Sequence, residues 1–406
     1  MAFFVTKFGG SSVASLEKMG NVAARVVEMK KQGHDLVVVV SAMGDATDDL
    51  LDLAAAIGKD LSPREMDMLL TTGEQQSAAL LALSLIARDC PAISLTGVQA
   101  GIKTDGQHGK ARIIGIEPTR ILEEIGNGKV VVIAGFQGLS PAGDVTTLGR
   151  GGSDTTAVAL AAKLKADRCV IFTDVDGVFT ADPRIVKEAH QLSSISYEEM
   201  LEMASLGAVV LQPRAAEFAM LYHVDIEVRS SFNNNPGTII TEGAKMERQR
   251  IVSGVAHDKN VARIALFDVP DHPGVASIIF KMLAAEGINV DMVIQSAMRD
   301  DRNDIAFTIE RNTFNRARPV VSEIVMKIGA SGMSFQTDVA KISIVGAGMQ
   351  SNPGVAASMF DALAHKGINI QMISTSEIKI SCIIDEDQIE TAVQALHDKF
   401  NLDKID

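Results

Sequence analysis

Two hydrophobic patterns divide the chain. In its first part, short apolar runs alternate with longer stretches in which apolar residues recur every three or four positions. Runs such as Leu36–Val40 and Val130–Ile133 consist almost entirely of Val, Leu and Ile, which is typical of parallel strands buried on both faces. The alternation predicts a β/α architecture built on a mostly parallel sheet.

The expected elements of this first block, residues 1–245, follow from the pattern. Strands are expected at Phe3–Lys7, Leu36–Ser41, Ala92–Thr96, Val130–Gly135, Cys169–Thr173 and Ile226–Arg229. Helices are expected at Ser15–Gln32, Pro63–Ala87, Glu117–Gly126 and Ser153–Lys165. The polar stretch Ser231–Glu247, with a Pro-Gly pair, predicts a linker at the end of the block.

The last third of the chain contains a repeat, since residues 273–293 recur as residues 353–373 with 11 of 21 positions identical. Around each copy the pattern predicts the order β-α-β-β-α-β of a ferredoxin-like unit. We expect Asp271 and Asn352 to cap the first helices, and Gly287 and Gly367 to end them. The remaining strands and helices are expected at Val261–Val269, Ile288–Ser296, Asp304–Arg311, Ala317–Ile328, Met333–Val339, Lys341–Gly346, Ile368–Ser376, Lys379–Asp385 and Glu386–Phe400.

The second copy is short by one strand. Its last strand would have to follow residue 400, but only six residues remain there. A strand-like run at residues 250–256 precedes the first copy. We therefore hypothesise that this run completes the sheet of the second copy, so that copy one (260–340) is inserted into copy two (341–406).

Composition narrows the function classes. The 406 residues are 47% hydrophobic and carry a formal net charge of −13, which argues against a nucleic-acid partner. No stretch has the ~18 apolar residues that cross a membrane, and the first residues do not resemble a signal peptide. Three widely spaced cysteines fit reduced thiols. A cytoplasmic protein is expected.

Glycine-rich turns after strands are the main chemical signal. No Gly-x-x-x-x-Gly-Lys-Ser/Thr or Gly-x-Gly-x-x-Gly motif occurs. Instead, residues 7–12, 149–154 and 173–184 combine glycine with charged residues. The first two turns precede expected helices and would present backbone N–H groups to an anion at the helix N-terminus. The third follows the strand Cys169–Thr173, and its acidic residues suit a nucleotide ribose and metal environment. Taken singly, each is also compatible with an ordinary tight turn or acidic loop.

Two further polar patches stand beside apolar runs. Ser41–Thr47 follows a valine run, and Thr71–Gln75 is expected to open a helix. Glu74 is a candidate for holding an ammonium group, although a solvated glutamate is the alternative. His108 lies in a polar loop, and no catalytic role is expected for it or for the other histidines.

Taken together and in order, these motifs resemble those of aspartate kinases, over nearly the whole chain. The matching segments are Lys7-Phe-Gly-Gly-Ser-Ser-Val13, Ser41-Ala-Met-Gly44, Thr71-Thr-Gly-Glu-Gln75, Gly149-Arg-Gly-Gly-Ser-Asp154, Thr173-Asp-Val-Asp-Gly-Val-Phe-Thr-Ala-Asp-Pro-Arg184 and Ser374-Thr-Ser-Glu-Ile-Lys-Ile-Ser381. The resemblance implies an α/β amino-acid-kinase fold followed by two ferredoxin-like ACT domains. It implies ATP-dependent phosphorylation of the aspartate side chain to 4-phosphoaspartate, the first step towards lysine, threonine and methionine, with diaminopimelate on the way in many bacteria.

The resemblance also implies roles for individual residues. Lys7 and Asp154 would be catalytic, with Asp154 organising the groups that face the phosphate. ATP, with Mg²⁺ bound mainly through its phosphates and no protein metal site, would be held by Lys7, Phe8, Gly9, Gly10, Thr173, Asp174, Phe179, Asp182 and Arg184. Aspartate would be held by Ser41, Thr47, Glu74, Arg150, Gly151 and Ser153, with Arg150 on its α-carboxylate and Glu74 near its amino group.

Regulation is implied by the ACT copies, which in the family pair between subunits into homo-oligomers and bind effectors. Lysine, threonine or both are the expected effectors. The implied effector residues are Asp271, Gly274, Ala276, Asn289, Asp291 and Gln295 in copy one and Asn369, Ile370, Ser376 and Glu377 in copy two. An internal start at Met246, giving a separate regulatory chain, is a further alternative.

Two positions depart from the family pattern. Val209 stands where many members have a lysine that contacts the nucleotide, and Ser12 stands where threonine is common. We therefore expect Lys7 to carry more of the γ-phosphate stabilisation. Three alternatives remain open: another amino-acid kinase acting on glutamate, acetylglutamate or uridylate, an amino-acid sensor with an inactive kinase domain, and a scaffold.

Overall fold

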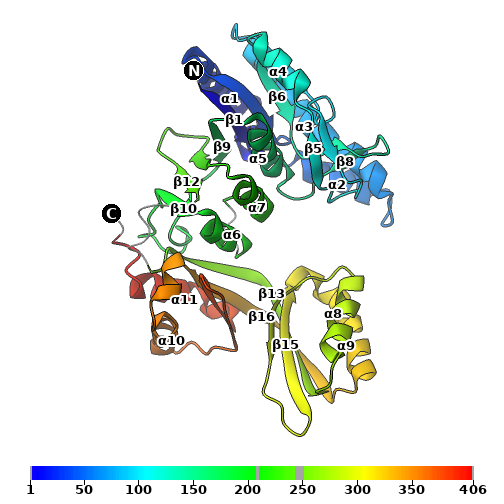
Figure 1. Ribbon diagram of the computed structural model, residues 1–406, viewed down its shortest axis with the longest axis vertical. Coiled ribbons are helices and arrows are strands. Elements are labelled where there is room, and N and C mark those ends of the chain that lie inside the picture. Colours follow the sequence, from blue (N-terminus) through cyan, green and yellow to red (C-terminus); the bar gives the residue numbers. More distant parts are fainter. Residues whose placement is uncertain (1, 207–209, 243–250, 405–406) are drawn as a thin grey trace. The chain divides into compact units, whose positions relative to one another are not determined.

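The computed structural model describes residues 2–206, 210–242 and 251–404 (Figure 1). They form two compact units. The first comprises the described residues within Met1–Val178, Gln191–Ser205 and Val209–Lys245. The second comprises those within Phe179–His190, Leu206–Ala208 and Met246–Asp406. Residues 179–190 therefore belong to the second unit, although the sequence placed them inside the first block.

The first unit is built on an eight-stranded sheet with the order β10-β12-β11-β9-β1-β2-β6-β3. All neighbouring strands are parallel except β11 and β12, which confirms the mostly parallel sheet. All six expected strands are present. The bounds are β1 (Phe3–Phe8), β2 (Asp35–Val40), β3 (Ala92–Leu95), β6 (Val130–Ala134), β9 (Arg168–Thr173), β10 (Ser194–Ser196), β11 (Ile226–Ser230) and β12 (Thr238–Thr241).

Helices accompany this sheet where the apolar periodicity predicts them. The four expected helices are α1 (Leu16–Lys31), α3 (Pro63–Ile86), α4 (Thr119–Gly126) and α5 (Gly152–Leu164). Three shorter helices were not expected, namely α2 (Ala46–Ala55), α6 (Tyr197–Ser205) and α7 (Pro213–Tyr222). A second sheet, in the order β5-β4-β7-β8, was also missed. Its strands are β4 (Ile102–Thr104), β5 (Ile113–Ile116), β7 (Gln137–Leu139) and β8 (Val145–Thr147).

The linker prediction for Ser231–Glu247 is wrong for its middle. Residues 238–241 form β12 inside the main sheet. Thr238 is fully buried, and its hydroxyl accepts a hydrogen bond from the amide of Val178 (2.9 Å) and donates to the carbonyl of Leu192 (2.6 Å). The polar sequence misled because this threonine satisfies backbone groups of the core. Residues 243–247 lie outside the described residues.

The second unit contains one six-stranded antiparallel sheet with the order β14-β15-β13-β16-β18-β17. Its strands are β13 (Gly254–Pro270), β14 (Val290–Gln295), β15 (Arg302–Glu310), β16 (Gly332–Val345), β17 (Met372–Thr375) and β18 (Lys379–Asp385). Four strands expected separately are therefore two long ones, because β13 and β16 run through both copies of the repeat. The copies share a sheet.

The pairing of these long strands bears on the insertion hypothesis. Residues 254–258 pair with residues 345–341, the first strand of the second copy. Beyond a register shift, residues 261–267 pair with 339–332 in the first copy. This is the pairing that insertion of copy one into copy two requires. Of the run 250–256, residue 250 lies outside the described residues and residues 251–253 precede the strand.

Two helices pack on each part of this sheet, α8 (Val275–Ala285) and α9 (Phe314–Ile328) on one part and α10 (Val355–His365) and α11 (Ile389–Lys399) on the other (Figure 1). Gly287 and Gly367 follow the helices α8 and α10 with φ of +65° and +71°, so the expected helix ends are confirmed.

The expected caps at Asp271 and Asn352 are wrong. Gly274 and Gly354 occupy the N-cap positions with φ of +104° and +96°, and no side chain caps either helix. The chain enters each helix through a left-handed glycine, so the polar residues upstream do not reach the first-turn amides. Asn352 instead donates to the carbonyl of Gly348 (2.8 Å).

No helix in the described ranges combines the length and the apolar character needed to cross a membrane.

An ion pair between a buried lysine and a half-exposed aspartate joins the two copies of the repeat. Lys341 on β16 has a side chain only 6% exposed, and its Nζ lies 2.5 Å from Oδ2 of Asp291 on β14, whose side chain is 46% exposed. A buried ammonium without a partner destabilises a fold strongly, whereas replacing a whole buried pair by apolar groups is often neutral.

We therefore expect Asp291→Ala to lower the free energy of unfolding by about 1–2 kcal/mol, a value reduced for the half-exposed carboxylate. The double variant Asp291→Ala/Lys341→Met should recover most of that loss. Calorimetric unfolding midpoints of the two variants and the wild type check this. A double variant less stable than Asp291→Ala would contradict the assigned cause.

Candidate active site

One cavity of 330 Å³ in the first unit gathers residues from four separate motifs. It opens where β1, β2 and α3 meet the glycine-rich turn before α5. Its lining includes nine residues that the sequence placed at a catalytic or binding site, namely Lys7, Gly10, Ser41, Thr47, Glu74, Arg150, Gly151, Ser153 and Asp154. Six others complete it: Ala42, Gly44, Phe136, Gly149, Gly152 and Gln212.

The central feature of this cavity is an ion pair. Lys7 lies at the end of β1, and its Nζ is 2.5 Å from Oδ1 of Asp154 in the first turn of α5. The two side chains are 11% and 9% exposed. A cation is thus fixed at the mouth of the β1 turn, beside the N-terminus of a helix, and both features favour an anionic ligand. This geometry supports a role for Asp154 in orienting Lys7.

Close backbone approaches explain two of the glycines. A Cβ on Gly10 would lie 3.0 Å from the carbonyl oxygen of Ala42, so the turns after β1 and β2 pack directly against each other. Gly151 has φ of +70°, and a Cβ there would lie 2.0 Å from the side chain of Gln212. The turn before α5 can therefore carry no side chain at this position.

Glu74 is the buried carboxylate of the site. It is 4% exposed and lies in the middle of α3, so the expectation that Thr71–Gln75 opens a helix is wrong. Its Oε1 accepts a hydrogen bond from the amide of Ala42 (3.2 Å), and its Oε2 has no partner. Burial raises the pKa of Glu74 to about 7, against the opposing effect of this backbone hydrogen bond. A buried, unpaired carboxylate oxygen is suited to a cationic ligand.

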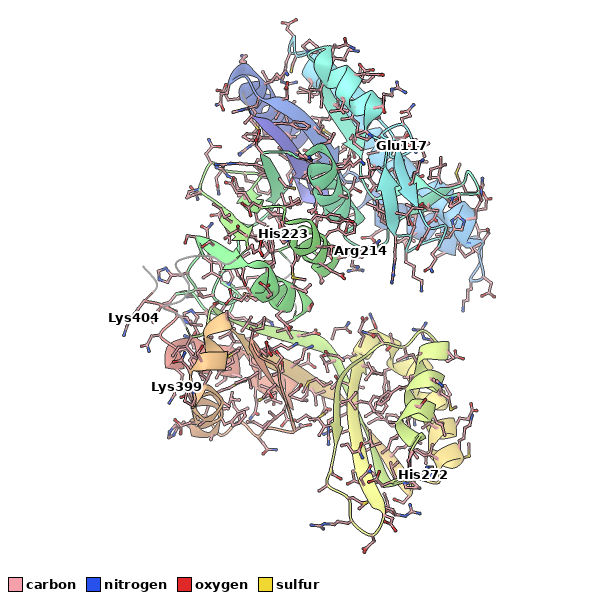
Figure 2. The ribbon with its side chains drawn as sticks, in the orientation of Figure 1. Glu117, Arg214, His223, His272, Lys399 and Lys404 are labelled. Carbon is pink, nitrogen blue, oxygen red and sulfur yellow. The ribbon has the colours of Figure 1, made fainter. Side chains whose placement is uncertain are left out.

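Arg214 stabilises the Gly149–Gly152 turn through hydrogen bonds to backbone carbonyls. It lies on α7 (Figure 2), and its Nη1 donates to the carbonyl of Leu148 (2.7 Å) while Nη2 donates to that of Ala111 (2.8 Å). This clamp fixes the residue next to Gly149 and so the position of Arg150. The sequence motifs predict no role for Arg214, Phe136 or Gln212. The sequence does contain two features that mark these positions: a proline directly follows Gln212, and an expected strand ends directly before Phe136.

Three of the residues expected to bind the nucleotide do not line this cavity but lie at strand ends of the same unit, namely Phe8, Gly9 and Thr173. Phe8 stacks on Phe172 at 4.6 Å, and the amide of Gly9 donates to the carbonyl of Phe172 (3.3 Å). Thr173 ends β9, and its carbonyl accepts a hydrogen bond from the hydroxyl of Ser231 (3.0 Å). Ser12, with its hydroxyl 2.5 Å from that of Ser231, thus links the first turn to the end of β9.

Asp174 follows Thr173, whose hydroxyl donates to Asp174 Oδ1 (3.1 Å). The remaining expected nucleotide residues, Phe179, Asp182 and Arg184, belong to the second unit. There the guanidinium of Arg184 donates to both carboxylate oxygens of Asp182, at 3.0 Å from Nε and 2.7 Å from Nη2. This pairing holds the pKa of Asp182 below its usual range. Val209, the departure from the family pattern, lies outside the described residues.

The expected effector residues of copy one lie at two places on the second unit. Asp271, Gly274 and Ala276 lie at the start of α8. The other three, Asn289, Asp291 and Gln295, lie at or next to the edge strand β14. Asn289 immediately precedes that strand, and Asp291 and Gln295 lie on it. Asp291 is the one that pairs with Lys341.

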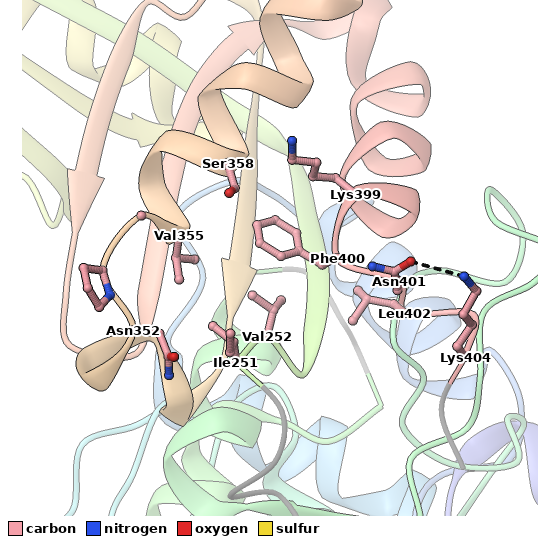
Figure 3. A pocket seen from close by; sticks show the side chains of 12 residues that line it. Ile251, Val252, Asn352, Val355, Ser358, Lys399, Phe400, Asn401, Leu402 and Lys404 are labelled. Carbon is pink, nitrogen blue, oxygen red and sulfur yellow. Dashed lines mark hydrogen bonds between the residues drawn. The ribbon is translucent and has the colours of Figure 1, made fainter.

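The expected effector residues of copy two do not line the cavity found there. A cavity of 530 Å³ lies between the N-terminal turn of α10 and the end of α11 (Figure 3). Its polar lining includes Asn352, Ser358 and Lys404. The expected residues lie instead before and after β17: Asn369, Ile370, Ser376 and Glu377.

Among the described residues, no group of three or more His, Cys, Asp or Glu side chains could hold a metal ion.

Family models match both parts of the chain. The amino acid kinase family model covers residues 2–230, and an ACT domain model covers residues 268–324 and 342–400. An aspartokinase of Bacillus sp. (strain MGA3) is 52% identical over 402 residues, which are 99% of this chain and 98% of that protein.

Two solved structures of E. coli aspartokinase III share the fold. The complex with aspartate and ADP, in its R-state, has a TM-score of 0.82 at 25% identity, covering 98% of this chain and 99% of that one. The complex with lysine and aspartate, in its T-state, has a TM-score of 0.75 at 25% identity, with the same coverage.

The raised pKa of Glu74 predicts a pH-dependent effect on stability. Between about pH 4.5 and about pH 7 the folded chain binds more protons at Glu74 than the unfolded chain does, so the stability contributed by this residue falls as pH rises through that window. Glu74→Gln lacks the titration and keeps an acceptor for Ala42. Relative to the wild type, it should gain up to about 3 kcal/mol between the two ends of the window.

Calorimetric unfolding at about pH 5 and about pH 8 measures this difference. The matched control is Glu123→Gln, which changes an exposed glutamate on α4. A Glu74→Gln effect that is the same at both pH values would contradict the buried, unpaired state of Glu74.

Proposed function

The chain belongs to the aspartate kinase family, and we propose that the 330 Å³ cavity binds L-aspartate and receives the γ-phosphoryl group of ATP. The observation that carries this assignment is the placing of Glu74, with an unpartnered Oε2, in the same cavity as the Lys7–Asp154 pair. The first suits the ammonium group of an amino acid, and the second suits a phosphoryl group.

Aspartate is held by groups of both charges in this proposal. The guanidinium of Arg150 binds the α-carboxylate, since its planar fork matches a carboxylate bidentately. Glu74 binds the ammonium group. The hydroxyls of Ser41, Thr47 and Ser153 and the backbone of Gly151 fix the orientation that points the side-chain carboxylate towards Lys7.

The nucleotide is assigned to the turns that follow the strands. Lys7 and the backbone of residues 8–10 hold the phosphates, as glycine-rich turns do in other folds. Thr173, Asp174, Phe179, Asp182 and Arg184 hold the rest of the nucleotide. The E. coli relative binds ADP, which supports this part. Mg²⁺, bound mainly through the phosphates, would supply further positive charge there.

The chemistry needs no general base. The aspartate side chain has a reference pKa near ~3.9, so its nucleophilic oxygen is already ionised at neutral pH. That oxygen forms a bond to the γ-phosphorus while the bond to the β-phosphate oxygen breaks, giving 4-phospho-L-aspartate and ADP. Lys7 and the helix N-termini stabilise the charge on the transferring group, and in-line placement supplies the rest of the rate. Asp154 holds Lys7 in place.

We assign the product to the biosynthesis of lysine, threonine and methionine, and regulation to the second unit, with lysine or threonine as effectors and homo-oligomers formed through the ACT copies. A lysine complex of the E. coli relative supports the effector class. The three cysteines are free and buried, which fits a reducing cytoplasm. The alternative of a separate regulatory chain starts at Met246, which lies outside the described residues.

Product trapping tests the function directly. An acyl phosphate reacts with hydroxylamine to give a hydroxamate, so purified protein with MgATP and L-aspartate should yield aspartyl hydroxamate. ADP formation measured with glutamate, N-acetylglutamate or uridylate in place of aspartate distinguishes the other kinases, since phosphorylated uridylate is not an acyl phosphate and gives no hydroxamate. ATP turnover with aspartate excludes an inactive sensor, and turnover with another acceptor in its place would overturn the substrate assignment.

Lys7→Ala should lower kcat by a factor of about 10² or more, since the variant loses a fixed charge at the transferring group. Steady-state kinetics measure this, with the unfolding midpoint followed because Asp154 loses its partner. The matched control is Lys31→Ala, an exposed lysine at the end of α1. Near-normal turnover in folded Lys7→Ala would remove Lys7 from the catalytic role.

L-Lysine, L-threonine or the two together should inhibit the reaction. Effector coupling is commonly ~1–3 kcal/mol, so a change of about 5- to 150-fold in an apparent binding constant is expected. Initial rates with each amino acid, alone and combined, and with the D-enantiomers as controls, measure it. If no combination changes the rate, the regulatory assignment fails.

A further inference from the structure

A buried hydrogen bond in the second unit joins residues 217 positions apart in the chain. The hydroxyl of Thr180 lies 3.1 Å from Nε2 of His397 on α11. Both residues are fully buried. This contact is costly to break, because the buried ring of His397 would be left without water and without another partner among the described residues.

Thr180 also anchors its own segment through three further hydrogen bonds. Its carbonyl accepts from the amide of Val255 at the start of β13 (2.7 Å). Its amide donates to the carbonyl of His190 (2.9 Å), and its hydroxyl accepts from the amide of His190 (3.0 Å). Thr180 thus closes the segment 179–190 on itself and fastens it to both a strand and a helix of the sheet that the ACT copies share.

Apolar packing holds the same segment independently. Ala181 and Val186 lie in one core with β13 and α11, where Val255 and Leu396 are members. The segment would therefore stay attached without the Thr180–His397 bond. What the bond adds is a fixed direction for Thr180, and with it for the neighbouring residues.

His397 is suited to such a contact because its ring stays neutral. Desolvation, the largest cause, lowers the pKa of His397, and His190 acts in the same direction, while Asp398, Asp403 and Glu188 oppose it. Nδ1 is buried without a partner, so a second ring proton would find no acceptor there. The bond through Nε2 is the one hydrogen bond that the ring makes among the described residues.

The segment fixed in this way carries three residues assigned to the nucleotide. Phe179 precedes Thr180, and Asp182 and Arg184 follow it by two and four residues. We propose that His397 is a positioning residue for nucleotide binding, which acts by holding Thr180 and thereby orienting Phe179, Asp182 and Arg184. This inference rests on the proposed function of those three residues. It predicts that a buried change on a helix of the ACT unit alters the use of ATP and leaves the use of aspartate unaltered.

Paired substitutions test the contact. Thr180→Val and His397→Leu remove the hydrogen bond with little change in volume, whereas Thr180→Ser keeps the hydroxyl and His397→Gln keeps a polar group at the Nε2 position. KM for ATP and for aspartate, kcat and the unfolding midpoint are measured for all four and for the double variant Thr180→Val/His397→Leu.

We expect the two disruptive variants to raise KM for ATP by about tenfold, the size of a hydrogen bond lost between buried groups. KM for aspartate should change less than twofold. The conservative variants should stay within threefold of the wild type for both substrates. The double variant should be no worse than Thr180→Val alone, because that variant already lacks the bond to His397 and, in addition, the acceptor for the amide of His190.

Two results would overturn the proposal. One is a lowered unfolding midpoint with both KM values unchanged, which is what a purely structural contact gives. The other is an equal rise in both KM values. Asp182→Ala and Arg184→Ala separate this inference from its premise: if they leave KM for ATP unchanged, the nucleotide assignment itself fails. If they raise it while Thr180→Val and His397→Leu do not, only the role of His397 fails.

Discussion

The proposed active site depends on one ion pair, between Lys7 and Asp154. A buried charge is tolerated only with a partner, so the end of β1 and the first turn of α5 must meet within contact distance. That requirement explains the glycines around it. Gly10 and Gly151 permit backbones and Gln212 to approach where a Cβ would collide. Arg214 then fixes the second turn through two carbonyls. Glu74 lines the same cavity, and its Oε2 has no hydrogen-bond partner. The cavity therefore offers an unpaired carboxylate oxygen to a cationic ligand, in addition to the fixed ammonium group of Lys7.

In the second unit, the corresponding constraint is strand continuity. Because β13 and β16 each run through both copies of the repeat, the copies share backbone hydrogen bonds and cannot move as separate domains without breaking that sheet. The Asp291–Lys341 pair crosses from one copy to the other. Residues 179–190 join this unit through its core. A structural change within the repeats can therefore reach residues 179–190 through the side chains packed in this shared core.

The sequence predicts those features that local pattern determines. Near-continuous apolar runs predicted all six of the strands expected in the first block, and the identical positions of the repeat predicted its helices and their glycine ends. Nine of the lining residues were expected because they belong to motifs that the chain shares with aspartate kinases. The misses depend on tertiary contacts. Thr238 reads as linker but completes core hydrogen bonds, Phe136 and Gln212 enter the cavity from unrelated elements, and the docking of Thr180 on His397 joins residues 217 positions apart.

Binding measurements on a variant with a neutral pair test the central claim that the Lys7–Asp154 pair serves the γ-phosphate. Lys7→Met/Asp154→Asn removes both charges together, which keeps the fold from having to bury an unpaired ion. Titration calorimetry would compare MgADP with a non-hydrolysable MgATP analogue on this variant and on the wild type. The account predicts that affinity for the analogue falls at least about tenfold, while affinity for MgADP stays within about twofold. Equal losses for both nucleotides, or no loss for either, would contradict it.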